Sequence, residues 1–153
     1  SLKASDKAEK AGYDQVLWLD AQYKKYVEEV GSMNIFFVKN GEVITPSLEG
    51  SILPGITRMS IIELLRHKGY KVTERLIEIE EIIQGIADGE VTECFGTGTA
   101  AVISPVGVIG YKGKDYTIAD GKTTGKITMD AYKSLTDIQL GRAEDIFNWV
   151  YKI

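Results

Sequence analysis

The sequence contains few of the residues from which disulfide frameworks, metal centres and catalytic triads are built. Among its 153 residues there is one cysteine, Cys94, and one histidine, His67. A single cysteine excludes an intrachain disulfide framework and a multi-cysteine metal site, and it fits the reducing, cytoplasmic location that we expect. A single histidine argues against a histidine-based zinc centre and against a Ser-His-Asp triad. We therefore expect no bound metal.

Long apolar runs and an excess of one charge are also absent. The longest apolar stretches are too short to cross a bilayer. The 18 basic and 22 acidic residues are interspersed and give a net charge of −4, which predicts neither a nucleic-acid partner nor a membrane partner. The sequence does have an apolar content of 44%, enough for one domain with its own core.

Apolar periodicity predicts strands in hairpins, with helices between them. The predicted strands are 15–20, 33–38, 42–45, 71–77, 91–95, 100–104, 106–111, 116–118 and 147–153, and the predicted helices are 2–11, 57–68, 79–87 and 127–142. Asn40-Gly41 is a strong signal for a two-residue hairpin turn. The pattern predicts the α+β class, with a mixed, largely antiparallel sheet and flanking helices.

The segment 54–58 (PGITR) places a tight turn directly before an amphipathic helix. The first turn of a helix presents unpaired backbone N–H groups and the positive end of the helix dipole, so it favours an anion such as phosphate. Thr57 adds a hydroxyl at the same point. The alternative is that Thr57 only caps the helix.

Two further segments can carry chemistry. In segment 96–100 (GTGTA), glycines allow the backbone to approach a ligand and two threonines supply hydroxyl donors. The alternative there is an ordinary hairpin or bulge between two strands. Glu28 and Glu29 lie just before a buried strand, where a carboxylate can pair with a cationic ring nitrogen. The alternative for this pair is two solvated acids.

Taken together and in order, several of these segments resemble one family. The motifs are QVLWLD, EEVGSMNIFF, TPSLEGSILPGITR, FGTGTAAVISPV, YKG and LTDIQLGR, and they look like those of the branched-chain amino-acid aminotransferases of fold type IV. The match runs along the whole chain. The resemblance implies the large, C-terminal domain of a pyridoxal 5′-phosphate enzyme, with the mixed, pseudo-barrel sheet of the D-amino-acid-aminotransferase-like fold.

The resemblance also implies a set of cofactor-binding residues. Glu29, in EVGSMN, matches the carboxylate that pairs with the pyridine nitrogen of the cofactor. Ile56 and Thr57, in LPGITR, match the backbone and hydroxyl donors to the phosphate. Gly98 and Thr99, in GTGTAA, match a turn that adds a further phosphate contact through Thr99.

Four positions match substrate-binding residues of the family. The backbone of the turn that contains Thr99 and Ala100 would receive the substrate carboxylate. Ser32 matches a small hydroxyl position next to the cofactor, and Gln15 matches a more remote residue lining the site.

The catalytic lysine of the family has no counterpart in this sequence. In the family, the lysine that forms the Schiff base lies in a K-x-GGNY motif, just upstream of the segment that begins at Ser1. The sequence holds no such motif, and Lys3, Lys7 and Lys10 do not match it. We therefore expect residues 1–153 to be a C-terminal cofactor-binding domain that lacks the small domain and the lysine. By itself it should be inactive, with weak cofactor binding at most.

For the intact enzyme, the resemblance implies transamination. Leucine, isoleucine and valine would be interconverted with their 2-oxo acids, with 2-oxoglutarate and glutamate as the second pair, by a homodimer. Two alternatives stay open. One is another fold-type IV enzyme, either a D-amino-acid aminotransferase or an aminodeoxychorismate lyase. The other is a degenerate binding domain that has kept the fold and lost the chemistry.

Overall fold

The computed structural model describes residues 16–31, 33–48, 55–98 and 103–139. Within these ranges there are nine strands and three helices. The predicted helix 2–11 and the predicted strand 147–153 lie outside the described residues. No helix in the described ranges is long and apolar enough to cross a membrane.

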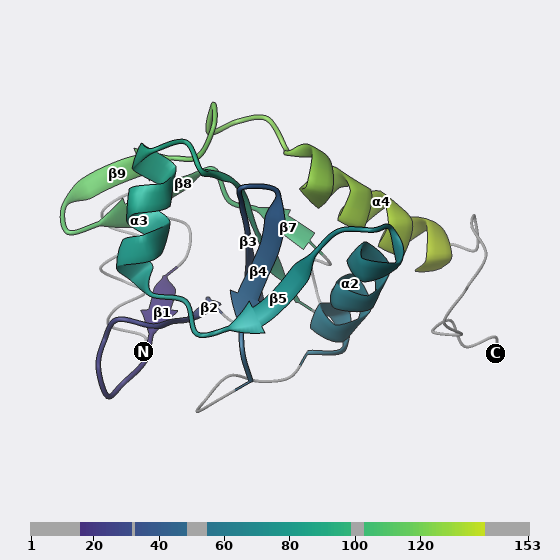
Figure 1. Cartoon of the computed structure of the whole chain (residues 1–153), viewed down its shortest axis with the longest axis horizontal. Coiled ribbons are helices and arrows are strands. Elements are labelled where there is room, and N and C mark those ends of the chain that lie inside the picture. The colour runs from purple at the N-terminus through teal and green to yellow at the C-terminus, as the bar shows by residue number, and fades with distance from the viewer. Residues whose placement is uncertain (1–15, 32, 49–54, 99–102, 140–153) are drawn as a thin grey trace.

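A seven-stranded sheet forms the centre of the fold (Figure 1). Its strands are β1 (Leu17–Leu19), β2 (Val27–Val30), β3 (Met33–Lys39), β4 (Glu42–Pro46), β5 (Val72–Arg75), β6 (Val91–Thr97) and β7 (Ile103–Pro105). β3 is the central strand. β6 pairs with one edge of β3, whereas β2 pairs with the first residues and β4 with the last residues of its other edge. All pairs are antiparallel except β4–β5. The prediction of a mixed, largely antiparallel sheet is confirmed.

Three helices and a separate hairpin cover this sheet. α2 (Ile56–His67) connects the parallel strands β4 and β5, as a parallel connection requires. α3 (Ile79–Ala87) and α4 (Lys126–Gln139) follow, and β8 (Val108–Tyr111) pairs with β9 (Lys114–Thr117) in the hairpin. α3 has the predicted bounds. The other helix and strand predictions that fall in the described ranges differ from the structure by a few residues, because the elements are shifted, shortened or, as in β3, β4 and β6, lengthened.

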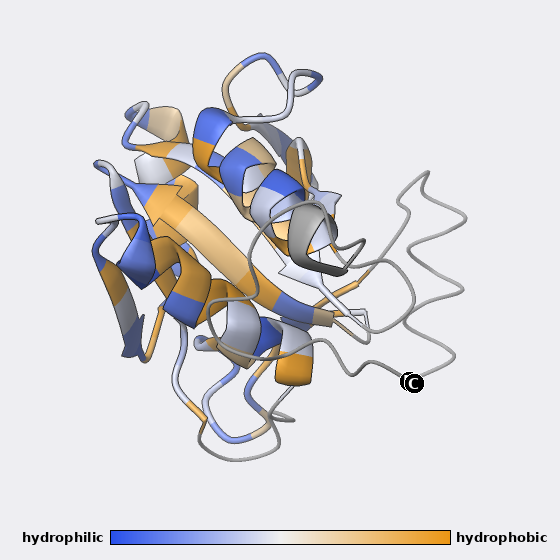
Figure 2. Ribbon diagram, turned by 90° about the vertical axis from the view of Figure 1, so that its right-hand side faces the viewer, coloured by the Kyte–Doolittle hydropathy of each residue, from blue (hydrophilic) through white to orange (hydrophobic). Residues whose placement is uncertain are grey.

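Two hydrophobic cores lie on opposite faces of the sheet. Successive residues of a strand point to opposite faces, so Ile35 and Phe37 of β3 enter one core while Phe36 and Val38 enter the other. The first core, called the α3-side core, contains α3 and the β8–β9 hairpin, and the second, the α2-side core, contains α2 and α4 (Figure 1). Figure 2 shows apolar residues gathered in the central strands, while the helices alternate between apolar and polar bands.

The turn between β3 and β4 has the geometry that its sequence predicts. Asn40 and Gly41 have φ values of 51° and 77°. A two-residue hairpin turn of type I′ needs positive φ at both positions, which asparagine tolerates and glycine adopts freely. The tight turn fixes the register that pairs Lys39 with Glu42.

β2 is the strand that the sequence analysis did not predict. The register pairs Leu19 with Val27 and Trp18 with Glu29, so Glu28 is an extra residue in a β-bulge. The bulge breaks the two-residue alternation of a regular strand, because Val27 and Val30, three residues apart, both enter the α3-side core. The sequence VEEV therefore lacks the pattern from which strands are recognised.

Candidate functional site

Three polar side chains form a row across neighbouring strands. Glu29 of β2 pairs with Asn34 of β3, and Asn34 pairs in turn with Thr97 of β6. Residues directly opposite one another in antiparallel strands project on the same face. This is the face of the α2-side core, because Phe36 and Phe95, two positions further along β3 and β6, belong to that core. The bulge in β2 orients Glu29 toward this face while Val30 points to the other.

The first turn of α2 lies against this row. Gly55 is the N-cap of the helix, and a Cβ atom added to it would lie 2.6 Å from Oδ1 of Asn34. A larger residue would force that amide to move, so glycine permits the close approach. The backbone of Gly55 is extended, with φ −84° and ψ 140°, a conformation open to all residues. The requirement for glycine is therefore steric, not conformational.

The electrostatics of this helix start favour an anion. Its first intrahelical bond joins the Met59 N–H to the Gly55 carbonyl at 3.1 Å, so Ile56, Thr57 and Arg58 donate to no carbonyl within the helix. Among the described residues no side chain caps the helix, and its first turn contains no acidic residue. The alternative that Thr57 serves as the N-cap is wrong, because Gly55 holds that position.

Arg58 fixes the helix start to the sheet. Its side chain is 2% exposed, and Nη2 donates to the Pro46 carbonyl at 3.0 Å and to Oε1 of Glu74 at 2.7 Å. These partners lie on β4 and β5, the strands that α2 connects. No role for Arg58 could be predicted from the sequence, because its partner Glu74 is 16 residues away and no local pattern predicts such a pair.

The structure allows four of the predicted site residues to be placed. Glu29 lies in the row, and Ile56 and Thr57 lie on the helix start that contacts the row. Ile56 is 83% exposed, which suits a residue matched for its backbone. Gly98 follows β6 and packs against Met33, whose Cγ would be 3.0 Å from an added Cβ. The other predicted residues, Gln15, Ser32, Thr99 and Ala100, lie outside the described residues.

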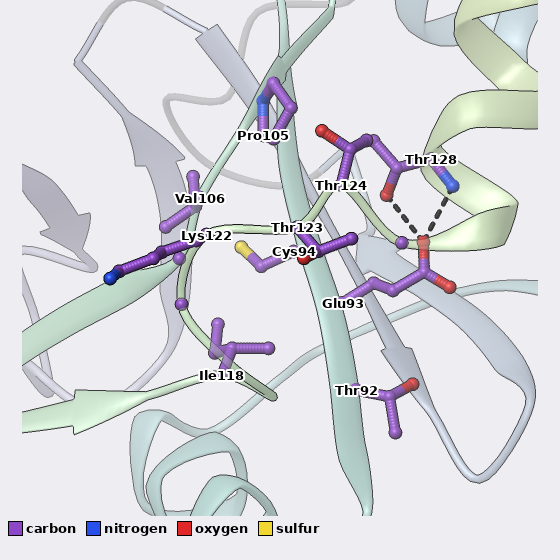
Figure 3. A pocket seen from close by; sticks show the side chains of 13 residues that line it. Thr92, Glu93, Cys94, Pro105, Val106, Ile118, Lys122, Thr123, Thr124 and Thr128 are labelled. Atoms are coloured by element: carbon purple, nitrogen blue, oxygen red, sulfur yellow. Dashed lines mark hydrogen bonds between the residues drawn. The ribbon is translucent and has the colours of Figure 1, made fainter.

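A small pocket of about 90 Å³ lies elsewhere, and none of the predicted site residues lines it. It is formed by β6, the end of β7 and the segment 121–125 before α4 (Figure 3). Beside it, Glu93 Oε1 accepts hydrogen bonds from the N–H and the hydroxyl of Thr128, both at 2.7 Å. Oε2 accepts from the N–H of Ile127 at 3.2 Å. The Glu93 carboxylate, which borders this pocket, thus caps the N-terminus of α4.

Comparison with known proteins agrees with the family resemblance. The model of the family described as amino-transferase class IV matches residues 1–109. The chain belongs to the class IV aminotransferases. Among curated members, the chain is 56% identical over 153 residues to branched-chain-amino-acid transaminase 1 of Bacillus subtilis. It is 45% identical over 152 residues to the chloroplastic branched-chain-amino-acid aminotransferase 5 of Arabidopsis thaliana.

These class IV relatives are longer than the chain. The alignments cover 100% and 99% of the chain, but only 43% of the Bacillus protein and 35% of the Arabidopsis protein. Solved structures give the same picture. The branched-chain aminotransferase of Escherichia coli matches with a TM-score of 0.80 and 31% identity, over 96% of this chain and 44% of that one. The holo form of the Thermobaculum terrenum enzyme, described as the PLP form, matches with a TM-score of 0.80 and 31% identity, over 95% and 43%.

Proposed function

We propose that the chain is the cofactor-binding part of a branched-chain amino-acid aminotransferase that uses pyridoxal 5′-phosphate. The supporting observation is the contact between the start of α2 and the row that contains Glu29, through Gly55 and Asn34. An anion-binding helix start and a carboxylate are thereby held on one face of the sheet. Relatives described as branched-chain aminotransferases supply the substrate class.

The donor set fits a phosphorylated pyridine. Backbone N–H groups at Ile56 and Thr57 and the Thr57 hydroxyl suit the phosphate, since no acidic residue of the first turn would repel it. A carboxylate at Glu29 suits a protonated ring nitrogen, which a neutral side chain would not keep charged. The two groups oppose each other in charge, as do the two ends of the ligand.

Each residue has a separate task in transamination. Pyridoxal phosphate, when bound, supplies an electron sink for the charge left at Cα after proton removal. Glu29 would hold a proton on the ring nitrogen and so strengthen that sink. The start of α2 would bind the phosphate and keep the ring from shifting. The segment that contains Thr99 and Ala100 would orient the substrate carboxylate, and with it the Cα–H bond. The lysine that moves the proton in this family has no counterpart in the sequence.

A binding titration tests the cofactor site without the aldehyde chemistry. Pyridoxamine 5′-phosphate cannot react with surface lysines, so its fluorescence change on binding reports the non-covalent site alone. We expect the 153-residue chain to bind it at least about tenfold more tightly than pyridoxamine, which lacks the phosphate. Thr57→Val should reduce that ratio, whereas Glu29→Gln should weaken both ligands.

Matched controls come from neighbouring residues. Glu28→Gln changes the adjacent carboxylate of the same bulge, and Thr117→Val changes a threonine of β9, on the other side of the sheet. Both should leave the two affinities within about twofold of the unmodified chain, the scale of a peripheral change. Equal affinities for the two ligands in the unmodified chain would contradict the proposal, as would equal effects of Glu28→Gln and Glu29→Gln.

A further inference from the structure

The hydroxyl of Thr97 is buried and has no hydrogen-bond partner. Thr97 is the last residue of β6 and is 1% exposed, and its Oγ1 is one of two buried side-chain polar atoms without a partner in the described part of the chain. Buried hydroxyls in native proteins are paired in the large majority of cases, because leaving one unpaired is costly. An unpaired hydroxyl in an otherwise well-bonded strand suggests that its partner is a ligand.

Thr97 belongs to the row that contacts the helix start. Thr97 stands opposite Asn34, and the Asn34 amide contacts the position of Gly55 at the N-terminus of α2. One step along the same face, the rings of Phe36 and Phe95 stack at 5.0 Å with an interplanar angle of 4°. These rings pack in the α2-side core together with apolar residues of α2. Thr97 is β-branched and in a strand, so its side chain is held in few rotamers and loses little entropy on binding.

We propose that Thr97 is a further cofactor-binding residue, whose Oγ1 donates a hydrogen bond to the phosphate held at the start of α2. This assignment rests on the proposed function. An anion suits the position, because the helix start presents donors and no acidic residue of its first turn competes for the hydroxyl. A hydroxyl donor at Thr97 would add to the backbone N–H groups and the Thr57 hydroxyl at the helix start.

Thr97→Val separates a ligand-binding role from a structural one. Valine keeps the shape and removes the hydroxyl. We expect about a tenfold loss of affinity for pyridoxamine 5′-phosphate, the scale of a hydrogen bond to a charged group, and less than about a twofold change for pyridoxamine. The unliganded variant should resist urea as well as the unmodified chain or better, since an unpaired buried hydroxyl contributes no stability. Thr97→Ser should recover most of the affinity.

Thr45→Val is the matched control. Thr45 is a fully buried threonine of the same sheet whose hydroxyl donates to the Ile35 carbonyl at 2.7 Å. Loss of the Thr45 hydroxyl should lower the urea midpoint and leave unchanged the ratio of the affinities for pyridoxamine 5′-phosphate and pyridoxamine. If Thr97→Val does not fold, Thr97→Ala removes the same hydroxyl and must give the same tenfold loss.

Three outcomes would overturn the assignment. The first is a Thr97→Val variant that binds both ligands as the unmodified chain does or weakens both equally. The second is a loss of stability without ligand comparable to that of Thr45→Val, which would mean that the hydroxyl has a partner within the protein. The third is an unmodified chain that binds the two ligands equally well, which contradicts the proposed function itself. The first two leave the proposed function intact, so the two failures are distinguishable.

Discussion

Glu81, at the residue scale, couples α3 to two strands of the sheet. Arg75 donates to both of its carboxylate oxygens, at 2.9 and 2.6 Å, and Lys39 donates to Oε2 at 3.0 Å. The Arg75 hydrogen bonds, assisted by Lys39, lower the pKa of the Glu81 carboxyl from its ordinary 4.5 to about 2. The folded state therefore binds a proton at Glu81 less readily than the unfolded chain does.

This shift predicts a pH-dependent contribution to stability. A carboxyl whose pKa falls on folding contributes fully above its unfolded value, and the contribution is lost as the pH drops from about 4.5 toward 2. Glu81→Gln should lower the free energy of unfolding at pH 7 by about 1 kcal/mol, a figure reduced for the partial exposure of the pair. The difference should shrink toward zero near pH 2. Urea unfolding across a pH series measures both.

Glu80→Gln is the control for this prediction. Glu80 precedes Glu81 on α3, but its side chain is 64% exposed and its ion-pair partner, Lys112, is 3.7 Å away. Exposed pairs of this kind contribute little, so the variant should match the unmodified chain at every pH. A Glu81→Gln difference that stays constant from pH 7 to pH 2 would mean that the stabilisation does not come from the charged carboxylate.

Single residues were predictable from sequence where one local property decided their role. Cys94, a small apolar residue in an apolar stretch, lies in the core at 2% exposed in β6, and burial raises the pKa of its thiol. Arg58 could not be predicted, since its role depends on Glu74 in a distant strand. The buried hydroxyl of Thr97 was recognised only as a donor in a glycine-rich segment. Its lack of a partner is a property of the packed structure.

At the scale of elements, the N-terminus of α4 is capped by a residue of β6, a strand that lies far from it in the sequence. The N–H groups of Ile127 and Thr128 donate to the Glu93 carboxylate of β6, at 3.2 and 2.7 Å. Gly125 makes room, because a Cβ there would lie 2.1 Å from Cδ of Glu93. A carboxylate at this position also interacts favourably with the dipole of α4. Strand and helix are thus joined by a contact between residues that are 34 and 35 positions apart.

Removing this cap should loosen α4 without affecting the candidate cofactor site. Glu93→Ala should cost about 1–2 kcal/mol, the range for losing an N-cap, and hydrogen exchange should accelerate most in the first turn of α4. The ratio of affinities for pyridoxamine 5′-phosphate and pyridoxamine should stay unchanged, since the pocket beside Glu93 is not the proposed site. Thr92→Ala, an exposed neighbour on β6, is the control. A changed affinity ratio in Glu93→Ala would place a ligand in that pocket.

Elements with regular periodicity were predicted, and those that depend on pairing were not. The spacing of Ile79, Ile82, Ile83 and Ile86 gives α3 an apolar face, and both of its ends match the prediction. β2 escaped prediction because its two glutamates sit in a bulge that only the partner strand β1 defines. The strand that contains the proposed ring-nitrogen carboxylate is therefore the one that periodicity does not reveal.

At the scale of the whole molecule, local patterns and long motifs contributed different parts of the prediction. Hairpin turns and short alternating strands predicted the fold class, and the structure confirms it. The specific function came from the order of the motifs, because distant segments meet only after folding. The strand register brings Glu29, Asn34 and Thr97 together, and the start of α2 places residues 55–57 beside them. No single segment contains the site, so no local pattern could have predicted it.

The family resemblance predicts that catalysis needs a lysine that the sequence does not contain. Because it lacks the K-x-GGNY motif, the 153-residue chain should show no leucine–2-oxoglutarate transamination, even where it binds pyridoxamine 5′-phosphate. A chimera would supply the missing residues. In it, the chain replaces the matching stretch of the Bacillus subtilis transaminase, to which it is 56% identical. We expect this chimera to convert leucine, isoleucine and valine, with the 2-oxo acids identified by chromatography, and sedimentation tests the predicted homodimer.

The Glu29→Gln form of the chimera tests whether this chain's own carboxylate serves the reaction. Its kcat should fall by roughly a hundredfold or more, the scale of losing a group that controls a proton in the transition state, while Glu28→Gln should leave kcat nearly unchanged. Turnover by the isolated chain would refute the need for the lysine. A folded but inactive chimera would support the degenerate-domain alternative. A chimera selective for D-amino acids would assign the chain to another fold-type IV enzyme, because the replaced stretch is the sole difference from the Bacillus enzyme.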